Sequence, residues 1–139
     1  MRLLNKDTDY AVRALLRVAG NPSGKIPVSE LSHKLKIPHP FLRKIFQTLQ
    51  KKGVVLSSKG KGGGFVLAAP PSEITLIRLM QIFQGPLELS HCLFGEELCT
   101  DIKTCPLRRR IQALEKAVIR DIKSVTLQTL LDERRKTHE

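Results

Sequence analysis

The sequence contains no tryptophan, and aromatic residues make up only 4% of its 139 residues. A core must therefore be built mainly from leucine, isoleucine and valine, and the apolar content of 41% is sufficient for one. No segment reaches the run of about 18 apolar residues that spans a bilayer. The first ten residues are charged and polar, with no apolar signal-peptide run. We therefore expect a cytoplasmic protein with one compact domain, extended at most by an oligomerisation helix.

Acidic residues are scarce. The chain has 13 of them against 24 lysines and arginines, which gives a formal net charge of +11. Such a chain attracts polyanions, because neutralising phosphates releases condensed counterions. We expect double-stranded DNA as the partner, with an anionic membrane surface as the rival.

The signals of an enzyme are also missing. No nucleophile–base pair stands out, and the glycine run at residues 60–64 lacks the Lys-Ser/Thr ending of a phosphate-cradling loop. We expect neither an enzyme nor a small-molecule substrate.

Apolar periodicity predicts a mainly α fold with a small β-hairpin. A first helix, capped by Asp7, Thr8 or Asp9, is expected to run to about Ala19. A second, opened by Ser29, covers residues 30–35, and a third runs from Pro38 or Pro40 to Lys52. The inner face of this third helix is predicted to comprise Phe41, Leu42, Ile45, Phe46 and Leu49. Further elements are strands at 54–56 and 65–67, helices at 75–84, from 106 and at 127–134, and a loop at 87–104.

Two helices joined by a short turn and followed by a hairpin form a winged helix-turn-helix. His39 and Arg43 lie one turn apart on the second of these helices, so both can reach base edges. Lys44 and Lys51 are better placed for phosphates, and free N–H groups at the Ser29 helix start can bind another phosphate. The structural alternative is an ordinary solvated helix face.

The predicted hairpin loop is basic and rich in glycine. Gly60 and its neighbours permit close approach to a sugar-phosphate backbone, and Lys59 and Lys61 are free to enter or straddle the minor groove. A plain glycine-rich turn is the alternative for this segment. Because the helix face and the loop occur together on a strongly basic chain, we favour DNA binding.

Three cysteines, Cys92, Cys99 and Cys105, fall within fourteen residues. An odd number cannot pair fully within one chain, and a cytosolic setting disfavours structural disulfides. The spacing differs from the Cys-x-x-Cys of zinc ribbons and ferredoxins, but thiolates on an irregular loop can hold an iron–sulfur cluster. Unpaired thiols in a flexible loop are the alternative.

Three segments resemble the family of the iron–sulfur cluster regulator and the nitric-oxide-sensitive repressor, IscR and NsrR. They are the opening residues 1–4, the segment DYAVR at 9–13 and GKGGGF at 60–65, and the resemblance extends to about Thr129. It implies a winged-helix homodimer on a near-palindromic operator and a long dimerisation helix. It also implies a cluster on Cys92, Cys99 and Cys105, and DNA contacts on residues 38–44, including Pro38 and Phe41, and on Lys59.

The fourth cluster ligand departs from part of that family. Some members have histidine three residues after the last cysteine, where this chain has Arg108, which cannot ligate metal. In others an acidic residue comes from the partner subunit, and Asp9 matches it best, with Asp7 close by. A carboxylate ligand would suit a four-iron rather than a two-iron cluster. Helix capping is the alternative role for Asp9, and His91 is a further candidate ligand.

These observations predict a DNA-binding domain at residues 1–84, a cluster loop at 85–105, and a dimerisation helix with a charged tail at 106–139. The near-heptad stripe from Leu107 to Val125 is long enough to lie along a partner helix. Two alternatives to a cluster-controlled regulator stay open: a cluster-free thiol-based redox regulator, and a small iron–sulfur electron carrier.

Overall fold

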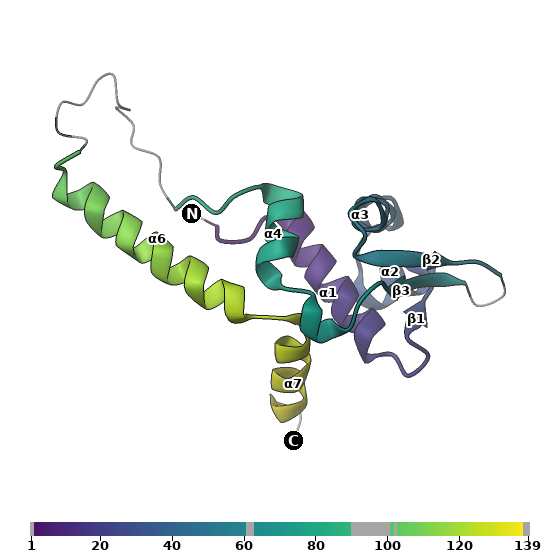
Figure 1. Cartoon of the computed structure of the whole chain (residues 1–139). Coiled ribbons are helices and arrows are strands. Elements are labelled where there is room, and N and C mark those ends of the chain that lie inside the picture. Colours follow the sequence, from purple (N-terminus) through teal and green to yellow (C-terminus); the bar gives the residue numbers. More distant parts are fainter. Residues whose placement is uncertain (1, 61–62, 90–100, 102, 138–139) are drawn as a thin grey trace.

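A computed structural model describes residues 2–60, 63–89, 101 and 103–137 (Figure 1). Its elements, in chain order, are α1 (Lys6–Gly20), β1 (Lys25–Ile26), α2 (Val28–Leu35), α3 (His39–Lys51), β2 (Val55–Ser58), β3 (Gly64–Leu67), the 3-10 turn η1 (Pro71–Glu73), α4 (Leu76–Gln84), α6 (Pro106–Ser124) and α7 (Leu127–Thr137). The predicted class, a mainly α winged helix-turn-helix, is confirmed.

Helix α1 lies at the centre of the domain and contacts α2, α3, α4 and α7. Its buried residues follow the predicted period: Thr8, Ala11, Ala14, Leu15 and Val18. The predicted cap was wrong, because α1 begins earlier. The side chain of Asn5 accepts a hydrogen bond of 2.8 Å from the backbone N–H of Thr8 and so satisfies the exposed helix end.

Helices α2 and α3 form the helix-turn-helix, and Lys36 between them adopts a left-handed conformation with φ of 54°. The prediction that Ser29 opens α2 was wrong, because the helix starts at Val28 after Pro27, whose side chain makes no capping hydrogen bond. Ser29 therefore lies inside the first turn, where it is exposed.

Four of the five predicted inner residues of α3 are buried: Leu42, Ile45, Phe46 and Leu49. Phe41 is the exception, since 51% of its surface is exposed. The prediction for Phe41 was wrong because Phe41 is rotated about 100° from Leu42 around the helix axis, which places its ring at the edge of the buried face. Phe46 continues the core by stacking on Phe65 of β3, with ring centroids 4.8 Å apart.

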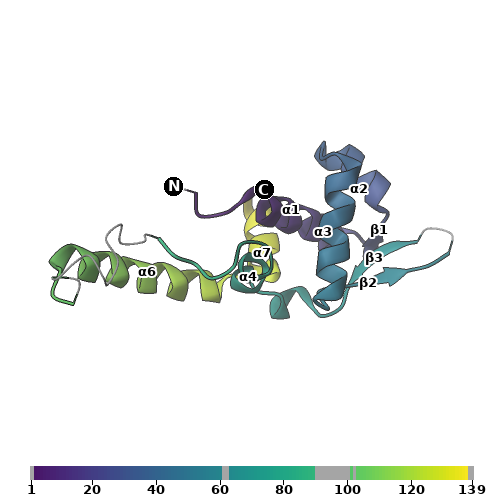
Figure 2. The ribbon, with the colours of Figure 1, turned by 90° about the horizontal axis from the view of Figure 1, so that it is seen from above.

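The sheet has three antiparallel strands in the order β1-β3-β2. Ile26 pairs with Phe65, and Val55 pairs with Leu67. The two-residue strand β1 adds to the predicted hairpin by pairing with β3 on the side away from β2. It joins the hairpin to the segment that leads into α2 (Figure 2).

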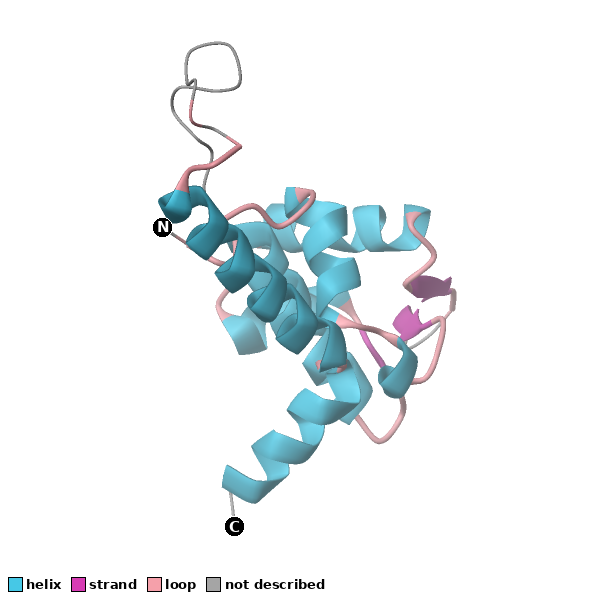
Figure 3. Cartoon of the chain, turned by 60° about the vertical axis from the view of Figure 1, so that its left-hand side comes forward, coloured by secondary structure: helices cyan, strands magenta, loops and turns pink. Residues whose placement is uncertain are grey.

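The C-terminal half returns to the core through backbone contacts. Leu76 N–H donates to Val125 O and Leu127 N–H donates to Ile74 O, each at 2.9 Å. Leu127 is buried in the same core as α1. Helix α6 extends away from this body and α7 packs beside α1 (Figures 1 and 3). Along α6, Ile122 is buried, whereas Leu107 and Leu114 are 69% and 58% exposed.

Candidate DNA interface and cysteine loop

The predicted DNA contacts lie on α2, α3 and the β2–β3 hairpin, which stand next to one another in Figures 1 and 2. Every one of them that falls within the described residues is exposed: Ser29, Pro38, His39, Phe41, Arg43, Lys44, Lys59 and Gly60. Lys61 lies outside the described residues. The structure thus presents these side chains to solvent on neighbouring elements, as a DNA-reading surface requires.

The exposed residues of α3 lie on different faces of the helix. Directly opposite the buried side lie Pro40, Lys44 and Lys51, all exposed. Arg43 lies on one flank of this outer face and Phe41 on the other. The N-terminal residues of a recognition helix contact base edges in the major groove, and His39, Arg43 and Lys44 lie in the first two turns of α3.

One cluster at this surface was missed by the sequence reasoning. The ammonium of Lys6 in α1 lies 5.3 Å from the ring centroid of Phe41 and 5.4 Å from that of Tyr10. Lys6 and Tyr10 are four residues apart on one helix, a spacing that places them together. Their meeting with Phe41 is a tertiary contact between α1 and α3, for which the sequence carries no local signal.

The glycines of the hairpin serve its internal packing as well as its surface. A Cβ on Gly64 would lie 2.5 Å from the carbonyl oxygen of Ile26, and one on Gly63 would lie 2.6 Å from that of Ser58. Gly60, with φ of 100°, turns the chain in the left-handed region. The hairpin therefore needs glycine at positions 63 and 64 for backbone contact within the protein.

The end of α4 is bonded to the start of α1. The amide oxygen of Gln84 accepts hydrogen bonds from Asn5 N–H at 3.0 Å and from the Thr8 hydroxyl at 2.9 Å, and its amide nitrogen donates to Leu3 O at 2.9 Å. Asn5 also donates to Phe83 O at 3.0 Å. Gln84 is the last residue of α4, immediately before the segment that leads to the cysteines.

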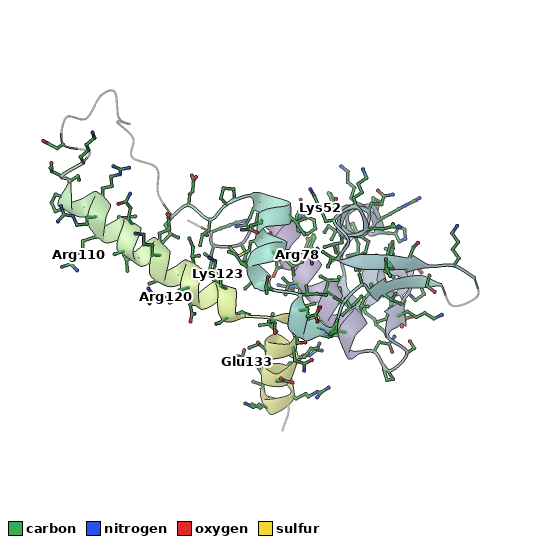
Figure 4. The ribbon with its side chains drawn as sticks, in the orientation of Figure 1. Lys52, Arg78, Arg110, Arg120, Lys123 and Glu133 are labelled. Carbon is green, nitrogen blue, oxygen red and sulfur yellow. The ribbon has the colours of Figure 1, made fainter. Side chains whose placement is uncertain are left out.

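The other end of α4 is bonded to the recognition helix. The guanidinium of Arg78 donates to the carbonyl oxygen of Lys52, the C-cap of α3, at 3.0 Å (Figure 4). A cation at the C-terminus of a helix satisfies a free carbonyl and complements the helix dipole. Helix α4 therefore touches both the start of α1 and the end of α3.

Of the three cysteines, only Cys105 is described; Cys92, Cys99 and His91 lie outside the described residues. Cys105 is half-buried at the N-cap of α6, and its thiol makes no capping hydrogen bond. The start of α6 carries Arg108, Arg109 and Arg110, and its first turn contains no acidic residue, although acidic residues are favoured there. Arg110 is labelled in Figure 4. This end of α6 is strongly positive.

Two acidic residues, one on α1 and one on α6, have partners within the chain. Asp9, in the first turn of α1, pairs with Arg13 at 3.0 Å, and the helix is capped by Asn5 instead. Glu115 of α6 accepts a hydrogen bond of 3.0 Å from Leu89 N–H, which joins the segment after α4 to α6. Within the described ranges no group of three metal-ligating side chains is assembled. The described helices include none that is both long and apolar enough to cross a bilayer.

Comparison with known proteins decides the family. Residues 4–133 match the Rrf2 family, described as iron-dependent transcriptional regulators. The chain belongs to the Rrf2 family. Among Rrf2 relatives, a protein of Aquifex aeolicus named as a helix-turn-helix transcriptional regulator is 32% identical over 88% of this chain and 87% of its own. The regulator IscR of Photorhabdus laumondii is 29% identical over 95% of this chain and 80% of its own.

Solved structures agree with the fold of this Rrf2 protein. IscR of T. potens superposes with a TM-score of 0.77 at 19% identity, covering 98% of this chain and 90% of that one. CymR, the global cysteine regulator of B. subtilis, gives a TM-score of 0.75 at 22% identity, covering 96% and 98%. The protein is therefore a DNA-binding winged-helix transcription regulator, and the expectation of a regulator is confirmed at this level.

Proposed function

We propose that this Rrf2-family protein is a homodimeric regulator whose binding to a DNA operator is controlled by an iron–sulfur cluster. Its ligands would be Cys92, Cys99 and Cys105, with Asp9 of the partner subunit as the fourth ligand of a four-iron cluster. The observation that carries the control is the position of α4. It is bonded to the start of α1 through Gln84 and to the end of α3 through Arg78, and it leads into the cysteine loop.

The described part of the loop suits a negatively charged cluster. Cys105 has a thiol without a capping bond, and the positive end of the α6 dipole adds to Arg109 and Arg110 beside it. These arginines are unfavourable for an isolated helix, because they repel its N-terminal dipole. An anionic group held by Cys105 would offset that repulsion. When bound, the cluster supplies a covalent link among the three thiolates, which oxidants or nitric oxide can remove.

The chain's own contacts provide the path from the loop to DNA. Leu89 is held to α6 through Glu115, and Gln84, five residues earlier, is held to Asn5 and Thr8 in α1. Ordering or releasing the segment between Gln84 and Cys105 would change the position of α4. Since Arg78 on α4 binds the last turn of α3, the angle of the recognition helix would follow.

The dimer rests on the exposed face of α6. Leu107 and Leu114 are exposed on one stripe with the half-buried Ile111 and Val118. Exposed leucines at near-heptad spacing are the pattern of a helix that packs on a partner helix. A second copy of this chain would cover that stripe and bring two recognition surfaces to one operator.

The deciding experiment compares wild type with the variant in which Cys92, Cys99 and Cys105 are all changed to alanine. Both are purified without oxygen, analysed for iron and sulfide, and tested for binding to a selected operator. We expect a brown, iron-containing wild type whose operator affinity changes on oxidation, and a colourless variant whose affinity does not. Equal affinities in all samples would refute cluster control.

A cluster-free thiol switch is the second candidate, and the likeness to the cysteine regulator CymR favours considering it. It predicts a colourless wild type with no iron. Its operator affinity would still change on oxidation and return with a thiol reductant. The absorption spectrum and the iron count therefore separate the two candidates before any DNA is added.

A further inference from the structure

The exposed ring of Phe41 has no role in the core. Among the exposed large hydrophobic side chains of the described residues it is the only aromatic one, at 51% exposure. It lies in the first turn of α3, between the exposed Pro40 and the buried Leu42. Exposed aromatic surface is costly in the free protein, and that cost is recovered when an apolar group covers the ring.

The ammonium of Lys6 lies over this ring. Its ammonium lies within 5.4 Å of both the Phe41 and Tyr10 ring centroids, close enough for a cation–π interaction with each. Lys6 belongs to neither of the ion pairs Arg13–Asp9 and Lys34–Glu30. The aromatic rings hold the charge in place and leave its N–H donors available.

An apolar ring beside a fixed cation matches one feature of the DNA major groove. Thymine is the base that presents a methyl group there, and each base is flanked by backbone phosphates. Resting on the DNA binding described above, we infer that Lys6 and Phe41 form a contact pair for DNA. Phe41 covers a thymine methyl group, and Lys6 binds a neighbouring phosphate. Thymine recognition by this chain is thereby assigned to α1 and α3 together.

The structural alternative is that the Lys6–Phe41 contact only holds α1 against α3. Replacing thymine by uracil in the DNA distinguishes the two, because it removes the 5-methyl group and nothing else. The operator is first selected from random DNA by anaerobically purified wild-type protein. Each thymine is then replaced by uracil in turn, and affinity is measured by fluorescence anisotropy for wild type and Phe41→Ala.

We expect one uracil position per subunit to weaken wild-type binding about fourfold, since burying one such group is worth about 0.8 kcal/mol. The same replacement should leave Phe41→Ala binding unchanged. A methyl effect that persists in Phe41→Ala, or the absence of any methyl effect in wild type, would overturn the inference. Thermal unfolding of Phe41→Ala verifies that this half-exposed site is not needed for folding.

Lys6 is tested by the salt dependence of the same binding. Lys6→Gln should reduce the slope of log affinity against log salt by about 0.9 for each phosphate that the lysine neutralises. Lys136→Gln removes the same charge from α7, which lies on the opposite side of α1 from α3 in Figure 1, and should leave the slope unchanged. Equal slopes for both variants would refute the phosphate contact. A failure of cluster control would appear separately, as equal affinity with and without the cluster.

Discussion

The hydroxyl of Thr8 and the side-chain amide of Gln84, 76 residues apart in sequence, lie 2.9 Å from each other at the junction of α1 and α4. Thr8 is fully buried, and its hydroxyl is also 2.7 Å from the Asn5 side chain that caps α1. A buried polar group of this kind must keep its partners, so the start of α1 and the end of α4 are held together as one unit.

This relationship predicts the effect of Gln84→Ala. The substitution removes the acceptor of the part-buried Asn5 N–H, whereas the Thr8 hydroxyl can still donate to the Asn5 side chain. We expect a loss of about 1–3 kcal/mol in the free energy of unfolding. It should also reduce the difference in operator affinity between cluster-loaded and cluster-free protein. Urea denaturation and anisotropy measure the two effects.

Gln81→Ala is the matched control, because Gln81 is an exposed residue on the same helix whose side chain makes no hydrogen bond among the described residues. It should change neither quantity. A Gln84→Ala protein that is as stable as Gln81→Ala would contradict the role assigned to this bond.

The hairpin glycines make a second prediction. In Gly64→Ala the new Cβ would collide with the carbonyl of Ile26, so β3 must shift away from β1, and we expect a destabilisation of about 1–3 kcal/mol. Gly20→Ala is the control, since its Cβ would meet only Leu131 at an ordinary 3.9 Å. That change should be neutral or stabilising by up to about 1 kcal/mol. Equal unfolding midpoints for the two variants would count against the close approach.

These two sites show how much of the structure could be predicted from the sequence. Apolar periodicity predicted α1, α3, α4 and α6 and most of the α3 core, because each of these helices repeats its pattern over several turns. The strand β1 has only two residues, too few for any pattern. The collision that keeps Gly64 as glycine is with Ile26, 38 positions earlier, which the sequence cannot place beside it.

The candidate site divides in the same way. Exposure of His39, Arg43 and Lys59 was predictable, since basic residues on a helix face and in a hairpin loop are local features. The role of Phe41 was misassigned to the core, because only the position of α1 shows which edge of α3 is covered. Likewise Asn5, rather than the predicted residues, caps α1, and its further bonds to Phe83 and Gln84 join residues that are distant in sequence.

Arg43 carries a prediction about base choice. It is exposed on α3 one turn after His39, within reach of a guanine edge. We expect Arg43→Ala to lower operator affinity by about 1–3 kcal/mol and to relax the preference at one base position. Repeating the selection from random DNA with the variant tests this. An equal loss on operator and on random DNA would show that Arg43 contacts phosphate only.

The face of α6 predicts the oligomeric state. Leu114→Arg places a charge in the exposed apolar stripe and should shift the protein from dimer to monomer in sedimentation velocity runs. Gln112→Arg adds the same charge about 160° away around the helix, at another exposed position, and should remain dimeric. A dimer that tolerates Leu114→Arg would place the interface elsewhere.

The pairing of Asp9 with Arg13 allows the fourth ligand to be tested without confusing ligation with helix stability. Both Asp9→Ala and Arg13→Ala break the 3.0 Å ion pair, whose side chains are 40% and 62% exposed. Loss of such a surface pair has a small effect on folding. Only Asp9→Ala removes a carboxylate that could reach a cluster.

We therefore expect Asp9→Ala alone to alter the Mössbauer spectrum and to speed cluster loss in air. In Arg13→Ala the carboxylate is released from its partner, so the cluster should be retained at least as well as in wild type. Identical spectra and loss rates in both variants would remove Asp9 from the ligand set and leave it as the ion-pair partner of Arg13.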